Sequence, residues 1–114
     1  MSFWFGGGVP EISVTDLEEV RGREAPVQLV DVREPDEFGA GHVAGAVLVP
    51  LGSLHLRLHE LDRDRPTYVI CQTGSRSAVA TRMLVQAGFR DVRNVAGGTL
   101  AWWTSGRPLA RGHE

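Results

Sequence analysis

The chain has 114 residues, of which 42% are hydrophobic and 23% charged, and its formal net charge at pH 7 is -2. This length accommodates one small α/β or α+β domain and leaves no room for a second. The weak net charge gives no reason to expect nucleic acid or a membrane as a partner. We therefore expect a single domain over 1–114, in which 1–10 is an N-terminal extension and 106–114 a C-terminal tail.

The residue types narrow the possible chemistry. Cys71 is the only cysteine and lysine is absent, which excludes an internal disulfide and Schiff-base chemistry. His55 and His59 lie four residues apart but lack a third ligand, so we expect no metal site, and we expect no cofactor. The first residues lack an export signal, and no stretch approaches the about 20 apolar residues that cross a bilayer. These features predict a cytoplasmic protein.

The first half of the chain alternates between helical and strand-like segments. Residues 15–18 have the pattern of a capping box and predict a short helix that ends near Gly22. The apolar run 27–32 predicts a buried strand with charged residues at its end. A turn or short helix then carries Phe38, and 46–49 predicts a second strand.

The second half continues this alternation. Leucines at helical spacing predict an amphipathic helix over 53–61, and the apolar residues 67–70 predict a strand. The next helix is predicted to start at Arg76 or Ser77 and to stop at Gly88. Its expected buried face holds Val79, Ala80, Met83, Leu84 and Ala87.

The last predicted elements are a short strand over 92–95 and a helix that follows Gly97-Gly98 and carries Trp102 and Trp103. Strands that alternate with helices indicate a largely parallel sheet covered on both faces. In open sheets of this kind, functional sites lie at the carboxyl ends of the strands. The predicted fold class is therefore α/β.

The segment that follows the 67–70 strand is Cys71-Gln72-Thr73-Gly74-Ser75-Arg76-Ser77. A loop that enters a helix N-terminus turns several backbone N–H groups inward and forms a nest for an anion or a charged sulfur. Gly74 allows the positive φ that such a bend needs. A lone cysteine is usually a buried apolar residue, but a Gln-Thr-Gly-Ser-Arg loop has no evident packing role beside it. We favour a functional Cys71.

The loop must change the ionisation of Cys71, because an ordinary thiol with a pKa of about 8.5 is only a few per cent thiolate at neutral pH. The helix dipole contributes about 0.3 to 1 kcal/mol, which is less than one pH unit. Hydrogen bonds from N–H groups to a charged sulfur contribute roughly 1.5 to 3 kcal/mol each, before competition from water. We predict that the loop backbone, helped by Arg76, activates Cys71.

Four segments of the chain are similar, in order and at domain spacing, to motifs of the rhodanese family. They are Asp31-Val32-Arg33-Glu34, His42-Val43-Ala44-Gly45-Ala46, Cys71-Gln72-Thr73-Gly74-Ser75-Arg76-Ser77 and Gly97-Gly98-Thr99-Leu100-Ala101-Trp102. The resemblance covers the chain from about Ile12 to Trp102. It implies a rhodanese-like α/β fold, with a five-stranded, mostly parallel sheet and helices on both faces.

The resemblance also implies a single-domain sulfurtransferase with Cys71 as its catalytic residue. A sulfane sulfur would pass from thiosulfate or a persulfide donor to a thiol or cyanide acceptor through a persulfide on this cysteine. With no second cysteine in the chain, the acceptor must be external, such as glutathione or a protein cysteine. The substrate-binding residues would be Gln72, Thr73, Gly74, Ser75, Arg76 and Ser77, with Arg76 and the loop amides on the donor anion.

Three more residues in the matched motifs are expected to support the site. Asp31 and Arg33 would brace the end of their strand through an ion pair or hydrogen bonds, and a substrate contact by Arg33 is the alternative. His42 belongs to a segment regarded as structural in the family, so we expect no catalytic role for it.

Two other functions stay open. Cysteine phosphatases and arsenate reductases of the same fold have five residues between cysteine and arginine, whereas Cys71 and Arg76 enclose four, a smaller nest that suits one sulfur. A catalytically silent module of the family would bind a partner instead. Such modules commonly lose the cysteine or the arginine, and this chain keeps both.

Overall fold

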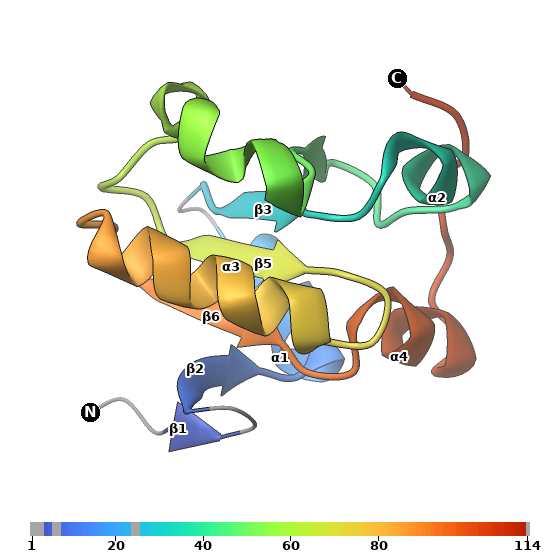
Figure 1. The fold of residues 1–114 in the computed structure, drawn as a ribbon. Coiled ribbons are helices and arrows are strands. Elements are labelled where there is room, and N and C mark those ends of the chain that lie inside the picture. The colour runs from blue at the N-terminus through green and yellow to red at the C-terminus, as the bar shows by residue number, and fades with distance from the viewer. Residues whose placement is uncertain (1–3, 6–7, 24–25, 114) are drawn as a thin grey trace.

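The computed structural model of the chain describes residues 4–5, 8–23 and 26–113 (Figure 1). Parts of the expected N-terminal extension (1–3 and 6–7), residues 24–25 and the last residue of the expected tail lie outside the described residues. No described helix is long and apolar enough to cross a membrane. The elements are β1 (Trp4–Phe5), β2 (Val9–Ile12), α1 (Val14–Arg21), β3 (Gln28–Asp31), α2 (Pro35–Ala40), β4 (Val47–Leu48), η1 (Leu51–Leu56), η2 (Leu58–Glu60), β5 (Thr67–Ile70), α3 (Ser75–Gln86), β6 (Val92–Val95) and α4 (Gly98–Thr104).

The strands form one sheet in the order β1-β2-β6-β5-β3-β4. The five strands from β2 to β4 are mutually parallel, which confirms the expected sheet, and β1 adds an antiparallel edge strand. The sequence did not predict β1 or β2, and β2 takes its first two residues from the expected N-terminal extension. Because β5 is the central parallel strand, the residues that follow it lie in the middle of the carboxyl edge.

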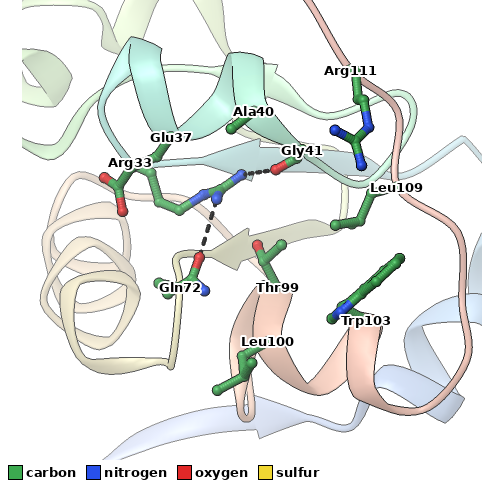
Figure 2. A pocket seen from close by; sticks show the side chains of 10 residues that line it. All are labelled: Arg33, Glu37, Ala40, Gly41, Gln72, Thr99, Leu100, Trp103, Leu109 and Arg111. Atoms are coloured by element: carbon green, nitrogen blue, oxygen red, sulfur yellow. Dashed lines mark hydrogen bonds between the residues drawn. The ribbon is translucent and has the colours of Figure 1, made fainter.

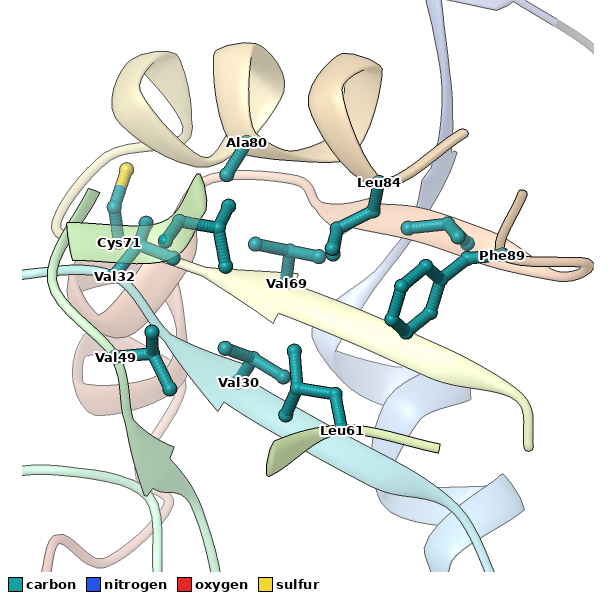
Figure 3. Packing of buried hydrophobic residues seen from close by; sticks show 11 residues of the cluster. Val30, Val32, Val49, Leu61, Val69, Cys71, Ala80, Leu84 and Phe89 are labelled. Atoms are coloured by element: carbon teal, nitrogen blue, oxygen red, sulfur yellow. The ribbon is translucent and has the colours of Figure 1, made fainter. Parts of the chain in front are cut away.

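Side chains of each strand alternate between the two faces of the sheet and therefore enter two separate hydrophobic cores. Val30 of β3 and Val69 of β5 belong to the core that packs under α3 and η1 (Figure 3). Leu29 and Ile70 belong to the core under α1 and α4. Cys71 lies at the end of the first core, so its side chain emerges on the α3 face of the sheet.

The prediction of an amphipathic α-helix over 53–61 is wrong. The segment forms two short 3₁₀ helices, η1 and η2, separated at Arg57, whose φ is -120°. The leucine spacing that suggested an α-helix also fits 3₁₀ helices, because residues three apart lie on the same side of each. Leu54 is fully buried, and the Arg57 guanidinium donates to the carbonyl of Leu48 at 3.3 Å, which fixes the break.

Two details of the predicted α-helices also differ. The first helix is capped by Ser13, whose hydroxyl accepts the N–H of Asp16 at 3.0 Å, rather than by a capping box over 15–18. In α3, which begins one residue before the predicted start, Val79 is 44% exposed instead of buried. Ser77 and Thr81 take buried places beside Ala80 and Leu84, because both hydroxyls have hydrogen-bond partners.

Helix α4 packs its first turn directly on the loop that follows β5. The N–H groups of Thr99 and Leu100 donate to the carbonyls of Cys71 at 2.9 Å and Gln72 at 3.0 Å. Gly98 allows this approach, with a φ of +60°, because a Cβ there would overlap the Cys71 carbonyl and lie 2.7 Å from the carbonyl carbon of Gln72. Glycine is therefore required at this position for both conformation and space.

We expect Gly98→Ala to lower the free energy of unfolding by about 3 kcal/mol or more, because it adds a backbone clash to left-handed strain. Gly106→Ala is the matched control, since Gly106 has a φ of +87° but no atom within 4 Å of a new Cβ. It should cost about 1 to 2 kcal/mol. Urea unfolding of both variants measures the difference, and equal losses would contradict the close approach of α4 to the loop.

Candidate functional site

Cys71 immediately follows β5 and is only 1% exposed. Its sulfur is directed toward the first turn of α3 (Figure 3). Its carbonyl accepts both the N–H of Thr99 at 2.9 Å and the hydroxyl of the same residue at 3.1 Å. The backbone of the candidate nucleophile is thus fixed by α4, and its side chain is left facing α3.

Hydrogen bonds to the sulfur lower the pKa of Cys71. The Gly74 N–H donates to Sγ at 3.1 Å, and the Ser77 hydroxyl lies 3.2 Å from the same atom. Burial alone raises the pKa of the thiol, but these bonds together outweigh burial. The Ser77 hydroxyl is the largest of the contributions that lower the pKa, followed by the N–H groups of Ser77, Gly74 and Thr73. The predicted role of the loop backbone is therefore shared with one side chain.

Arg76 is paired with a carboxylate. Its guanidinium contacts both oxygens of Glu37 on α2, at 2.7 and 2.9 Å. The hydrogen bond from Arg76 lowers the pKa of Glu37 to about 2, and the same bond, with a smaller contribution from the nearby charge of Cys71, raises the pKa of Arg76. The positive charge that we expected to face a donor anion is therefore already balanced within the protein.

Asp31 and Arg33 form the expected ion pair at the end of β3, with both side chains almost fully buried and 2.9 Å between Nη2 and Oδ2. The guanidinium also donates to the Gly41 carbonyl at 2.7 Å and to the side-chain oxygen of Gln72 at 3.2 Å (Figure 2). These hydrogen bonds compensate for the desolvation of the buried pair. Arg33 thereby connects the end of β3 to the loop that carries Cys71.

A cleft of about 420 Å³ opens beside the loop (Figure 2). Arg33 and Gln72 line it from the strand side, and Trp103 lines it from α4. Residues of the expected C-terminal tail close the other side, with Leu109 and Arg111 among the lining residues. Gln72, the direct neighbour of Cys71, faces this cleft, and Cys71 itself is not among its lining residues.

His42 makes its contacts within the fold. Its Nδ1 lies 2.8 Å from the carbonyl oxygen of Phe38, and the two rings stack with centroids 3.7 Å apart. Its backbone pairs with Ala110 of the tail. Within the described part of the chain, no three His, Cys, Asp or Glu side chains are grouped as a metal site.

Apart from Arg76, which pairs with Glu37, the loop residues named from the sequence fall into three groups. Gly74 and Ser77 contact the sulfur, and Gln72 faces the cleft. Thr73 and Ser75 line a different hollow on the outer side of the loop, although the Thr73 N–H contributes to the lowered pKa of Cys71. Residues of the loop therefore face the cleft as well as the outer hollow, and only some of them contact the sulfur.

Sequence analysis missed Glu37 and Asn94. Asn94 lies on β6, is 1% exposed, and contacts both Ser77 and Gly74. Its place two residues after the buried Val92 was the available signal, because alternation puts both side chains on the same face of the strand and a buried polar group needs partners. Glu37 gave no signal of its own, since its partner Arg76 is 39 residues away in the sequence.

We expect Ser77→Ala to raise the pKa of Cys71 by about one pH unit, because a hydrogen bond to a charged group is lost. The pH dependence of alkylation by iodoacetamide, which reacts with the thiolate, measures this change. Ser75→Ala is the control, because Ser75 is exposed in the first turn of the same helix. The same alkylation midpoint in Ser77→Ala and the parent would contradict the assigned contact.

Comparison with known proteins places these residues in a family. Residues 13–105 match the model of the rhodanese-like domain. The chain is 34% identical over 101 residues to a protein named sulfurtransferase from Allochromatium vinosum, covering 89% of this chain and 94% of that protein. It is 35% identical over 94 residues to the putative sulfur carrier protein YrkF of Bacillus subtilis, covering 82% of this chain but about half (51%) of that protein.

The fold comparison agrees. The crystal structure of a rhodanese-like domain protein from Staphylococcus aureus has a TM-score of 0.81 and 31% identity, covering 90% of this chain and 98% of that one. The family match includes the Cys71 loop, the buried Asp31–Arg33 pair and the first turn of α4. The chain therefore belongs to the rhodanese family.

Proposed function

We propose that the protein is a sulfurtransferase in which the Cys71 thiolate accepts a sulfane sulfur and carries it as a persulfide. The observation that carries this proposal is the pair of donors on the sulfur, Gly74 N–H and Ser77 hydroxyl, at 3.1 and 3.2 Å. They favour the thiolate, which is the nucleophilic form of cysteine. The relatives named as a sulfurtransferase and as a putative sulfur carrier support the same chemistry.

The reaction consists of two displacements at sulfur. The Cys71 thiolate attacks the outer sulfur of the donor, a new S–S bond forms, and the old bond breaks with its electron pair leaving on sulfite when the donor is thiosulfate, or on a thiolate when the donor is a persulfide. An acceptor thiolate or cyanide then attacks the outer sulfur of the Cys71 persulfide. The Cys71 thiolate is the leaving group, so the enzyme returns to its starting form with no net redox change.

The acceptor is an external thiol, since the chain has no second cysteine. Glutathione or a protein cysteine fits this requirement, and such thiols stay reduced in the cytoplasm, which is the compartment we propose. Cyanide would serve as an acceptor in an assay. The cleft lined by Gln72, Leu100 and Trp103 offers the space beside the loop for the approach of this acceptor.

A partner-binding module without catalysis is the second candidate. Leu100 and Trp103 on α4 are 45% and 56% exposed beside the cleft, and large apolar side chains that are exposed together are typical of protein contacts. This candidate requires no persulfide. It is therefore distinguished from the sulfurtransferase by the covalent state of Cys71.

We expect incubation with thiosulfate to add one sulfur atom to the protein, mapped to Cys71 by peptide mass spectrometry and removed by cyanide. Cys71→Ser should gain no sulfur and show no thiosulfate-to-cyanide transfer, while its thermal melt stays close to that of the parent because the side chain keeps its shape. A folded Cys71→Ser variant with substantial activity, or a parent chain that takes up no sulfur, would overturn the proposed function.

The Glu37–Arg76 pair predicts a donor preference. We expect Glu37→Gln to raise kcat/KM for thiosulfate about fivefold, because removing one negative charge near the approaching dianion is worth about 1 kcal/mol. A glutathione persulfide donor should gain less. Because the pKa of Glu37 is lowered to about 2, this carboxylate is charged throughout the assay range, and the ratio of variant to parent should not change between pH 5 and 9.

The matched control for this experiment is Glu60→Gln. Glu60 also pairs with an arginine, Arg57, at 2.8 Å and has similar exposure, but it lies in η2 rather than beside the loop. Its substitution should leave kcat/KM for thiosulfate unchanged. An equal gain in both variants would point to overall charge, and a loss in Glu37→Gln would show that the pair positions Arg76 for the donor.

A further inference from the structure

The side chain of Asn94 lies directly behind the loop. Its Nδ2 donates to the Gly74 carbonyl at 3.0 Å, and its Oδ1 lies 2.5 Å from the Ser77 hydroxyl oxygen. The bond to Gly74 determines the orientation of the amide, because the opposite orientation would place two carbonyl oxygens against each other. Asn94 therefore presents an acceptor, and no donor, to Ser77.

Ser77 has one hydroxyl proton and two acceptors within reach. Asn94 Oδ1 is 2.5 Å away and Cys71 Sγ is 3.2 Å away. The side chains of Ser77 and Asn94 are 0% and 1% exposed, so bulk water does not satisfy either group. The proton must then go to one of these two acceptors at a time, and the choice depends on the charge of the sulfur.

We propose that Asn94 is a positioning residue that accepts the Ser77 hydroxyl proton while Cys71 Sγ is uncharged and yields this proton to Sγ when the thiolate forms. This inference deepens the proposed function and rests on it for the persulfide state. Its geometric basis, the shared hydroxyl between a buried amide and a buried sulfur, is independent of that function.

During the proposed reaction cycle the negative charge alternates between Cys71 Sγ and the outer sulfur of the persulfide, so the preferred acceptor of the Ser77 proton alternates as well. In the thiolate, the charge is on Sγ, and a charge-assisted hydrogen bond from Ser77 is the stronger choice. In the persulfide, Sγ is bonded to two atoms and is neutral, while the outer sulfur carries the charge. A neutral sulfur is a weak acceptor, so without Asn94 the buried hydroxyl would lose most of its hydrogen bonding in this state.

Asn94 consequently stabilises the states in which Sγ is neutral. Its presence should raise the pKa of Cys71 relative to a chain without the amide, in opposition to Ser77 itself. The charged groups around the loop include two ion pairs, Arg76–Glu37 and Arg33–Asp31. Arg111 lines the cleft beside Gln72, and Glu11 and Arg82 line the hollow that also holds Asn94. Substitution at position 94 leaves both pairs in place, so changes in the pKa of Cys71 report on the hydroxyl.

The test measures the midpoint of alkylation of Cys71 by iodoacetamide against pH. We expect Asn94→Ala to move the midpoint down by about half a pH unit, since Ser77 then donates to the sulfur alone. Asn94→Asp should move it up, because a carboxylate holds the proton more strongly. If Asn94 only anchors Gly74, both variants lose the same anchor and both midpoints move up, which would overturn the proposal.

The Ser77→Ala background provides the second arm. Without the hydroxyl, the downward shift of the alkylation midpoint from Asn94→Ala should disappear, and the upward shift from Asn94→Asp should shrink. Either variant alone is a sufficient test if the other does not fold. Full shifts in this background would overturn the proposal. Gln28→Ala is the control for loss of a buried amide, because Gln28 lies at the other end of the sheet and bonds Thr67 at 2.9 Å; it should lower stability and leave the midpoint unchanged.

The persulfide state gives a separate readout. At a fixed ratio of thiosulfate to sulfite and a pH above the alkylation midpoint, where free Cys71 is the thiolate, the ratio of persulfidated to free Cys71 in Asn94→Ala should fall about threefold, which corresponds to half a pH unit. Alkylation requires no sulfur donor. A parent chain that never forms a persulfide but shows the expected alkylation shifts would therefore contradict the proposed function and leave the role of Asn94 standing, whereas an unchanged persulfide fraction would overturn its role in transfer.

Discussion

A charged sulfur at Cys71 can exist only because hydrogen-bond donors replace the water that burial removes. The side chain is 1% exposed, and burial by itself raises the pKa of the thiol. The donors must therefore come from the protein, at short range and in fixed directions. They are a loop N–H at 3.1 Å and a side-chain hydroxyl at 3.2 Å, and both lie at the start of α3.

The fold supplies those donors by holding the loop from outside. Backbone N–H groups of helix α4 donate hydrogen bonds to the carbonyls of Cys71 and Gln72, and the side chain of Asn94 on β6 donates to the carbonyl of Gly74. With these acceptors turned away and satisfied, the N–H groups of the same peptide chain are free to face the sulfur. Nearby charged side chains form the ion pairs Asp31–Arg33 and Glu37–Arg76. The described surroundings of the sulfur thus include backbone and hydroxyl dipoles and two ion pairs.

Much of this arrangement could be predicted because it is local. Apolar runs identified β3, β5 and β6, and the order of strands and helices indicated the parallel sheet. Strand β2 was missed because Pro10 and Glu11 interrupt its apolar pattern, and its place in the sheet depends on pairing with β6, far along the chain. The contacts of Glu37 with Arg76 and of Asn94 with Ser77 span 39 and 17 residues. Such pairs are created by tertiary structure, and residue spacing does not indicate them.

The position of the donors also bears on which atom the loop is built to hold. In a nest for a tetrahedral oxyanion, the N–H groups converge on a point beyond the nucleophile, where the oxygens of the substrate would lie. Here Gly74 N–H and the Ser77 hydroxyl both reach Sγ itself, and four residues separate Cys71 from Arg76. Arg76, which would face such an anion, has both arms of its guanidinium on Glu37. Donors on the sulfur stabilise it as an attacking thiolate and again as a leaving group. A thiolate is both nucleophile and leaving group in phosphoryl transfer through a cysteine as well, so donors on Sγ serve either chemistry. The paired charge of Arg76 and the four-residue spacing are the features that favour sulfur transfer at this site.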